Sequence, residues 1–397
     1  MNILFVTWNG PEVTYIEGLF LPIFEGIASK AGHKFHIIQY TWGDKDKIEQ
    51  TKKLCESKGV KFTSVGITRK PAALGVLKAI FLNSRVVKEY IIKNGIDVVM
   101  PRATTSAAIC LRAIKNLKQV KFLYDADGLP QDERVDFGGW DAESLKYRIY
   151  RDIEFLALRK SDAVLTRSYA AKEILASRAG AGFKKNLIHV ITNGKKLEEE
   201  PQFRTSVLQN KKFAGPKLIY AGSMGPQYCL HEMLLIFKLV LKEHPGAGLT
   251  ILTGNVKYAL DLISQLPEIK NKIEVFNVKA QEVPGYLQAA DFGLALRVPS
   301  FSMLAVAPIK LSEYLLSGLP VIATKSIGDT ERYLNNSAAA FMMEDMSEQS
   351  LKSAAQWLCK TYQNNLVNMK AEARSIGKKY FDLARTVAQY NKAIDSL

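Results

Sequence analysis

The sequence predicts an α/β protein of two domains, each built on a parallel β-sheet with helices on both faces. Three observations predict this class. At 397 residues, the chain is longer than one ordinary hydrophobic core requires. Short, continuously apolar segments alternate with helical ones, as expected for strands that are buried on both faces. One polar stretch near the middle interrupts the alternation and separates two similar halves.

The first half begins with the apolar run NILFVTW, residues 2–8, followed by a helical segment over 12–31 that ends at Gly32. A later helix begins near Pro71 and stops at Gly95, because proline suits a first helical turn and glycine the position after the last. A charged helix is expected at 44–58, and further strands at 33–42, 60–66, 97–102, 121–127, 162–168 and 188–194.

Residues 195–216 are polar, contain two prolines and lack apolar periodicity, so we expect a linker there. The alternation then restarts. It predicts strands at 217–223, 249–254, 273–278, 292–297 and 320–324, with a helix at 229–243 and another at the end of the chain.

Composition excludes several classes of protein. The chain is 47% hydrophobic and 23% charged, as in globular proteins. No apolar run approaches the ~20 residues of a membrane-spanning helix, and the first ten residues resemble a strand more than a signal peptide. The four cysteines form no CxxC pair, and no histidine pair has metal-ligand spacing. We expect a cytoplasmic protein with buried, reduced thiols and no metal site.

Positive charge is concentrated in the first half. The net charge is +15, and residues 1–196 hold 32 Lys and Arg against 20 Asp and Glu, whereas the remainder holds 22 against 19. This asymmetry indicates that the first domain has an anionic partner. The candidate partners are a membrane surface, a pyrophosphate-linked substrate and nucleic acid. A charge bias that serves only solubility is the alternative.

Polar residues follow predicted strands in the second half, where open parallel sheets bind ligands. Gly222 and Ser223 come between a strand and a helix, where backbone N–H groups can approach a phosphate. Arg297 ends an apolar strand. Lys310 and Glu313 lie about one turn apart on a short helix, and suit a phosphate and sugar hydroxyls respectively. A tight turn, a local salt bridge of the arginine and a surface Lys–Glu pair are the structural alternatives.

The segment APIKLSEYLLSGLPVIAT, residues 307–324, with VPGYLQAADFGLALR, residues 283–297, resembles the nucleotide-sugar site of GT-B glycosyltransferases. The closest resemblance is to the large retaining group called family four, or glycosyl transferases group 1. The stretch NGPEVTYIEGLFLPIFEGIASKAGHKFHII is similar to that group's opening loop, first helix and second strand. The resemblance implies two Rossmann-like domains that face a central cleft: residues 1–195, with a terminal helix 375–397 packed back on them, and residues 212–374.

The resemblance also implies roles for residues. Glu313 matches the carboxylate that binds the donor ribose, and Arg297 and Lys310 would stabilise the charge that grows on the leaving diphosphate without a metal. The strand-end loop 275–278 matches the one that reads the base. The donor-binding residues would be Gly222, Ser223, Phe276, Val278, Arg297, Lys310 and Glu313.

Two positions depart from the group's pattern. Ala305 stands where many members carry a second glutamate, eight residues before Glu313. Gln227 and Tyr228 stand where many members carry a Lys-Gly pair after the first strand of the second domain. Either Arg297 and Lys310 bind the phosphates alone, or donor binding is weakened.

The first domain offers acceptor-side candidates. The motif Asp125-Ala126-Asp127 is literally a DxD, the metal motif of the GT-A fold, but in this architecture Asp127, Asp132 or Glu133 is better placed to hydrogen-bond or deprotonate an acceptor hydroxyl. We assign Asp127 to catalysis with Arg297 and Lys310. A solvated acidic loop that pairs with Arg102 is the alternative. The acceptor-binding candidates are Gly10, Tyr15, Glu17 and Arg102.

The helix over 68–95 has two distinct faces. One apolar stripe is predicted to face the core: Leu74, Leu77, Ile80, Ser84, Val87 and Ile91. At its edge, apolar and basic side chains form a candidate surface for anionic lipid, with ordinary packing and a solvated face as the alternative: Phe81, Val86, Tyr90, Lys78, Arg85 and Lys88.

Together these features predict a metal-independent, retaining glycosyltransferase of the hexosyltransferase type without a cofactor. It would use a UDP- or GDP-linked sugar and act on a glycan or a lipid-pyrophosphate-linked acceptor at the inner membrane face, in bacterial surface polysaccharide or glycolipid assembly. Three alternatives stay open. They are a sugar-nucleotide epimerase of the same fold, a DNA glucosyltransferase, which is disfavoured because nucleic acid is not the expected partner, and a non-catalytic nucleotide-sugar-binding protein.

Overall fold

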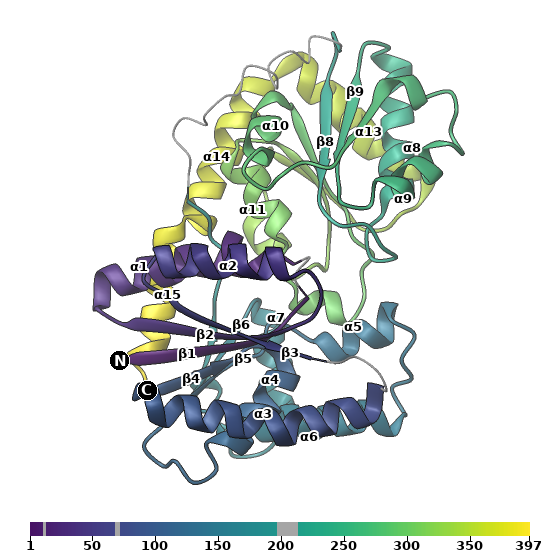
Figure 1. The fold of residues 1–397 in the computed structure, drawn as a ribbon. Coiled ribbons are helices and arrows are strands. Elements are labelled where there is room, and N and C mark those ends of the chain that lie inside the picture. Colours follow the sequence, from purple (N-terminus) through teal and green to yellow (C-terminus); the bar gives the residue numbers. More distant parts are fainter. Residues whose placement is uncertain (11–12, 68–71, 197–212) are drawn as a thin grey trace. The chain divides into compact units, whose positions relative to one another are not determined.

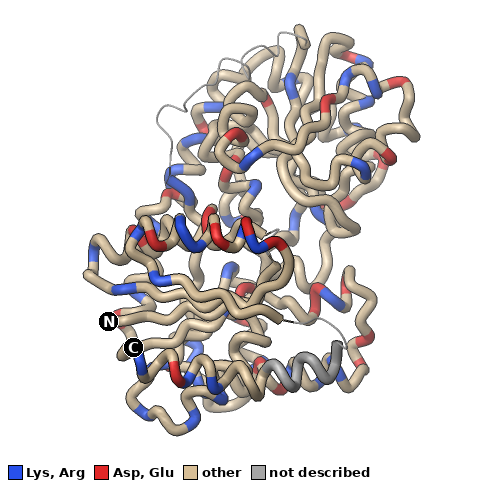
Figure 2. Tube along the Cα trace, in the orientation of Figure 1, with Lys and Arg blue, Asp and Glu red and all other residues tan. Residues whose placement is uncertain are grey.

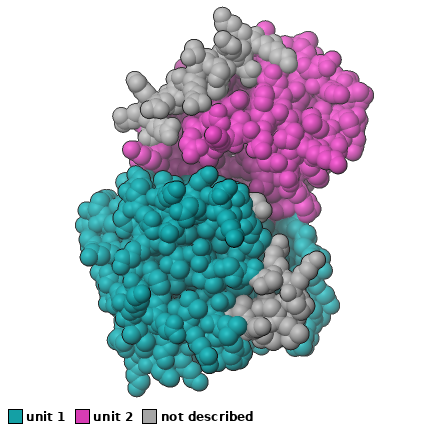
Figure 3. Space-filling model, viewed as in Figure 1, with its two compact units in different colours: residues 1–192, 383–397 teal, residues 193–382 magenta. Residues whose placement is uncertain are grey.

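The computed structural model describes residues 1–10, 13–67, 72–196 and 213–397, with the side chains of 72–79 excepted. The chain forms two compact units, one of residues 1–192 and 383–397 and the other of residues 193–382 (Figure 3). Each unit contains one sheet whose strand pairs are all parallel. The predicted α/β class, with a parallel sheet in each half of the chain, is confirmed.

The first unit has a seven-stranded sheet of order β3-β2-β1-β4-β5-β6-β7 (Figure 1). Central β1 and β4 are buried on both faces because their side chains are mainly apolar, with Thr7 as the buried polar residue of β1. The strands are β1 (Asn2–Trp8), β2 (Lys34–Thr41), β3 (Lys61–Gly66), β4 (Val98–Pro101), β5 (Lys121–Asp125), β6 (Ala163–Thr166) and β7 (Ile188–Val190).

Helices cover both faces of this sheet. Helix α4 packs between α3 and α6 on one face, and α1 packs against α15 on the other (Figure 1). The helices are α1 (Leu21–Ala31), α2 (Lys45–Ser57), α3 (Ala72–Asn94), α4 (Ala103–Ala113), α5 (Pro130–Phe137), α6 (Leu145–Lys160), α7 (Tyr169–Arg178) and α15 (Leu383–Ile394). The expected helix over 12–31 is in fact a π-helical turn, Ile16–Phe20, followed by α1. Gly32 ends it as predicted, with a left-handed φ of 67°.

The second unit has a six-stranded sheet of order β10-β9-β8-β11-β12-β13. Its strands are β8 (Lys217–Ala221), β9 (Gly248–Leu252), β10 (Ile273–Phe276), β11 (Phe292–Ala295), β12 (Val321–Thr324) and β13 (Ala340–Met343). Strand β13 was not predicted, because it is short, lies at the edge and is only partly buried, so it lacks a continuous apolar signal. The helices are α8 (Leu230–Glu243), α9 (Val256–Ile263), α10 (Val283–Ala289), α11 (Ile309–Leu316), α12 (Thr330–Leu334), α13 (Glu348–Asn364) and α14 (Leu366–Phe381).

The end of the chain differs from the expected single helix over 375–397. Helix α14 packs against α11 and belongs to the second unit, and the extended residue Asp382 separates it from α15 of the first unit. Lys195 forms a parallel bridge with Asp382, and its N–H donates to the Phe381 carbonyl at 2.9 Å. Most of the expected linker, residues 197–212, lies outside the described residues.

All four cysteines are free and buried, as predicted. None of the helices in the described part of the chain has the length and apolarity needed to cross a lipid bilayer.

Candidate functional site

The structure brings Gly222, Arg297 and Lys310 together at the carboxyl ends of two neighbouring strands. Gly222 directly follows β8, Arg297 is the second residue after its neighbour β11, and Lys310 lies in the first turn of α11. Gly222 has φ 151°, and a Cβ at this position would lie 1.9 Å from Cε of Lys310. The lysine side chain therefore crosses directly over the backbone of Gly222, which only a glycine permits.

Lys310 is half-buried and packs against two tyrosines. Its Nζ donates to the Tyr220 hydroxyl, which in turn donates to the Ser223 carbonyl. The same Nζ lies 4.1 Å from the ring centroid of Tyr220 and 4.0 Å from that of Tyr228. Burial lowers the pKa of the Lys310 amine well below its usual value, and the positive charge of Arg297 lowers it further.

Arg297 also contacts Tyr228. Its guanidinium carbon is 4.7 Å from the ring centroid of Tyr228, and Nη1 contacts the Met303 sulfur at 3.6 Å. Its backbone N–H donates to Oγ1 of Thr324 at the end of β12, at 3.0 Å. This bond fixes the arginine beside the end of the neighbouring strand.

Neither cation has a carboxylate partner among the residues that the structure describes. Glu313, the nearest acid in sequence, pairs instead with Lys195, with 2.6 Å between Nζ and Oε1. The alternatives of a local salt bridge for Arg297 and a surface Lys310–Glu313 pair are thus not observed. Two basic groups held close together without a carboxylate partner resist being charged at the same time, and a bound anion would favour the charged form of both.

The remaining donor-side candidates border the same sheet edge. Phe276 ends β10 and its ring lies 5.7 Å from that of Tyr286, and both Phe276 and Val278 are half-buried against the core that includes α11. Ser223 is exposed directly after Gly222. Ala305 is fully buried in a short 3-10 turn before α11.

The acidic and basic strand-end residues of the first unit neutralise one another. Arg102, after β4, contacts Asp127 at 2.6 Å, and Arg167, after β6, contacts Asp125 at 2.6 Å. Both carboxylates of the literal DxD therefore bind an arginine, which is the alternative noted for Arg102. The guanidinium carbon of Arg102 also lies 4.8 Å from the ring centroid of Tyr15. In contrast to Arg297 and Lys310, these cations have acidic partners.

Two further candidates of the first unit take part in other contacts. Glu17 accepts a hydrogen bond from the Thr51 hydroxyl on α2 and is not part of the Arg102 cluster. Gly10 is buried, and its carbonyl accepts from the N–H of Val13 at 3.2 Å.

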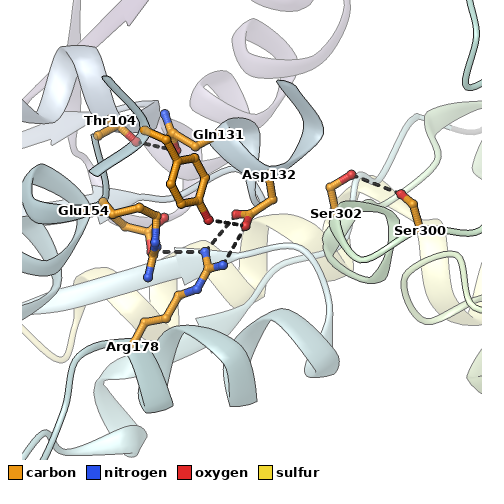
Figure 4. Close-up of polar contacts among 9 residues, drawn as sticks. Thr104, Gln131, Asp132, Glu154, Arg178, Ser300 and Ser302 are labelled. Atoms are coloured by element: carbon orange, nitrogen blue, oxygen red, sulfur yellow. Dashed lines mark hydrogen bonds and ion pairs between the residues drawn. The ribbon is translucent and has the colours of Figure 1, made fainter. Parts of the chain in front are cut away.

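Asp132 has a structural role (Figure 4). Both of its carboxylate oxygens accept from Arg178, at 2.8 and 2.9 Å, and one also accepts from the hydroxyl of Tyr147 at 2.8 Å. Arg178 lies on α7 and Tyr147 on α6, so the carboxylate ties α5 to both helices. The suggestion that Asp132 deprotonates an acceptor is therefore not supported by its contacts.

Three residues of the donor side were not among the predicted binding residues: Lys195, Tyr220 and Tyr228. The position of Tyr228 in place of a Lys-Gly pair was the available signal, but the sequence does not show that its ring contacts both cations. Lys195 is 118 residues away from Glu313, and no local pattern predicts a pair at that separation.

Two family models match the chain. The model of Glycosyl transferases group 1 matches residues 202–376, and that of Glycosyltransferase Family 4 matches residues 28–199. No curated protein sequence matches the chain significantly.

Similar solved structures share the fold at low identity. Anabaena HepE in complex with UDP and glucose has 16% identity and a TM-score of 0.70, with 100% of both chains covered. A glycosyltransferase from Rickettsia africae has 15% identity and a TM-score of 0.70, with 100% of this chain and 98% of that chain covered. UDP-GlcNAc 2-epimerase from Neisseria meningitidis, bound to UDP-GlcNAc, has 12% identity and a TM-score of 0.62, with 100% of both covered.

The fold and the two family models together define the class: the protein is a glycosyltransferase with the GT-B fold. The Family 4 model matches the first unit and the group 1 model matches the second.

Proposed function

We propose that the protein transfers a hexose from a UDP- or GDP-linked donor to an acceptor hydroxyl, with retention and without a metal. The observation that carries this proposal is the pair Arg297 and Lys310, which lies beside Gly222 without a carboxylate partner in the described chain. Fixed cations of this kind stabilise a bound diphosphate. They stabilise the transition state more, because negative charge grows on the diphosphate as the sugar leaves.

In this mechanism the bond between the anomeric carbon and the phosphate oxygen breaks, and its electron pair stays on the diphosphate between Arg297 and Lys310. The acceptor oxygen forms the new bond to the anomeric carbon and gives up its proton to the carboxylate of Asp127. Glu313 accepts hydrogen bonds from the ribose once its pairing with Lys195 is broken. Phe276 and Val278 border the base, and Gly222 and Ser223 border the phosphates. Asp127, with Gly10, Tyr15, Glu17 and Arg102, is assigned to the acceptor side.

Thermal-shift measurements with UDP-, GDP- and dTDP-sugars test donor binding. We expect one nucleotide to raise the melting temperature clearly above the others, because a ligand at a hundred times its Kd stabilises the folded state by about 2.7 kcal/mol. Absence of stabilisation by every nucleotide sugar would contradict the proposal. An epimerase, favoured by the UDP-GlcNAc 2-epimerase neighbour, would alter the donor sugar when no acceptor is present, whereas the proposed transferase would leave it intact.

We further propose that the acceptor is a lipid-pyrophosphate-linked glycan at the inner membrane face, in bacterial surface polysaccharide assembly, and that the first unit contacts anionic lipid. The buried stripe of α3 supports this: Ser84, Val87 and Ile91 face the core, which leaves the opposite side of the helix outward. Predicted members Leu74, Leu77 and Lys78 lie outside the described side chains. The outward face carries large exposed apolar side chains: Phe81, Leu82, Val86 and Ile92.

Basic side chains lie near these apolar ones, together with one exposed acid of α3, Glu89. Arg112 of α4 lies over the Phe81 ring at 3.9 Å, and Arg85 and Lys93 are exposed on α3 itself. Lys and Arg recur along α3 and in the loop after α4 (Figure 2). The predicted edge residue Tyr90 instead bonds His36 Nδ1 through its hydroxyl, at 3.1 Å. An apolar face bordered by cations suits the headgroup region of an anionic bilayer.

Vesicle co-sedimentation tests this contact. We expect the protein to bind vesicles that contain phosphatidylglycerol and not pure phosphatidylcholine. Phe81→Ser with Leu82→Ser should weaken binding by about a hundredfold or more, because each large apolar side chain that leaves water contributes about 1.5–3 kcal/mol and about 1.4 kcal/mol is a factor of ten. Val367→Ser is the matched control, since Val367 is 82% exposed on α14 in the other unit. Equal binding by the double variant would show that α3 is not the contact surface.

A further inference from the structure

The ring of Tyr228 contacts both cations of the donor site. Its centroid is 4.0 Å from Nζ of Lys310 and 4.7 Å from the guanidinium carbon of Arg297. These two residues come from different elements, α11 and the segment after β11, and Tyr228 lies in the loop between β8 and α8. Among the residues that the structure describes, the ring of Tyr228 contacts both Arg297 and Lys310, whereas that of Tyr220 contacts Lys310.

The loop that carries Tyr228 is fixed beside Arg297. The carbonyl of Gln227 accepts from the N–H of Val298 at 3.2 Å, which joins the loop to the residue after Arg297. The N–H of Tyr228 donates to the Gly225 carbonyl at 3.0 Å, and its own carbonyl accepts from Leu230 at 2.7 Å. Three backbone hydrogen bonds therefore hold the segment that carries the ring.

An aromatic ring can hold cations in a way that a carboxylate cannot. A carboxylate would neutralise the lysine and the arginine and would compete with an incoming diphosphate. The face of a tyrosine ring attracts a cation, more strongly when water is excluded, yet leaves its net charge in place. Burial and the charge of Arg297 both disfavour the ammonium form of Lys310. The charge of Glu313, one turn further along α11, favours that form, and so does the face of the ring.

We propose that Tyr228 is a positioning residue that holds Arg297 and Lys310 side by side, both charged, for a ligand with two linked anionic groups. The inference rests on the proposed donor site and specifies how that site keeps its charge without a counter-ion. A diphosphate meets both cations, whereas a monophosphate meets one, so the pair selects the nucleotide diphosphate over the monophosphate.

Steady-state kinetics of Tyr228→Leu and Tyr228→Phe with the donor found in the thermal-shift screen test this role. We expect Tyr228→Leu to raise the donor KM about tenfold or more and to lose most of the preference for UDP or GDP over its monophosphate in inhibition. Tyr228→Phe keeps the ring face and should behave like the wild type. Tyr362→Leu is the matched control, because this half-buried tyrosine of the same unit packs on His244 and touches neither cation.

The pH profile separates positioning from a general structural effect. The alkaline limb of kcat/KM reports the loss of the charged form of an essential group in the free enzyme. In Tyr228→Leu this limb should move to lower pH, because Lys310 loses a contact that favours its ammonium form, whereas Tyr228→Phe should keep the wild-type limb. If Tyr228→Leu lowers the melting temperature, Tyr228→Met replaces it in the comparison, because its longer, unbranched side chain reaches further into the space of the ring.

The outcomes for this inference and for the proposed function differ. Failure of the wild type to bind or turn over any nucleotide sugar contradicts the proposed function itself. An active wild type together with a Tyr228→Leu variant of unchanged KM, unchanged diphosphate preference and unchanged pH limb overturns the role of Tyr228 alone.

Discussion

Replacing Arg297 by alanine should lower kcat/KM for the nucleotide-sugar donor by at least about a hundredfold, because removal of one fixed group that stabilises transition-state charge typically costs a factor of 10²–10³. The side chain makes no ion pair among the described residues, so its loss leaves no buried carboxylate without a partner. The melting temperature should therefore stay close to that of the wild type. Donor turnover and a thermal melt of the same preparation check both halves of this expectation.

We expect Glu313→Ala to lower donor turnover in the same way, because it removes the proposed ribose contact. Its loss leaves Lys195 without its partner, but that side chain is 29% exposed and can reach water, so the melting temperature should fall only slightly. Matched controls are available in the same unit: Arg374→Ala on the exposed face of α14, and Glu344→Ala, which breaks the exposed pair with Lys325. Wild-type turnover by Arg297→Ala or Glu313→Ala would refute the assignment of the site.

The strand pattern predicted most of the fold because parallel strands that are buried on both faces have a continuous apolar signal. It failed where that signal is weak. The edge strand β13 is short and half-exposed, and the break at Asp382 between α14 and α15 lies within a segment whose helical periodicity continues on both sides. At the first helix, the π-helical turn has the same composition as an ordinary helix, and periodicity does not distinguish the two.

The site was predictable to the extent that strand order determines it. Gly222 and Arg297 follow strands that pair with each other, so their proximity follows from the fold class alone. The partners of each side chain were not predictable. Whether Arg102 meets a ligand or Asp127 depends on loop conformation, and the contact of one tyrosine ring with two cations depends on three separate segments. Sequence spacing contains no information about such distances.

Arg167→Met is expected to reduce the stability of the first unit by about 3–5 kcal/mol, because it leaves a buried carboxylate without its partner. Arg167 is 3% exposed and Asp125 is fully buried, and Nη2 of the arginine lies 2.6 Å from Oδ2 of the aspartate. Arg167 also bonds the Tyr390 hydroxyl, so α15 packs over the pair. Urea unfolding, with hydrogen exchange of the β5 and β6 amides to locate the change, measures the loss.

The pH dependence of the unfolding free energy of Arg167→Met shows why the variant is less stable. Burial raises the pKa of Asp125, and Arg167 opposes that rise. Without the arginine, the pKa of Asp125 in the folded state lies further above its value in the unfolded state. The loss of stability should therefore be largest at neutral pH, and it should shrink as the pH falls through the raised pKa and the carboxyl becomes neutral.

Asp125→Asn combined with Arg167→Met should recover part of the loss at neutral pH. Arg148→Met, which breaks an exposed pair with Glu143, should cost less than about 1 kcal/mol at every pH. A deficit in Arg167→Met that does not change with pH would show that lost packing, and not the unpaired carboxylate, destabilises the unit.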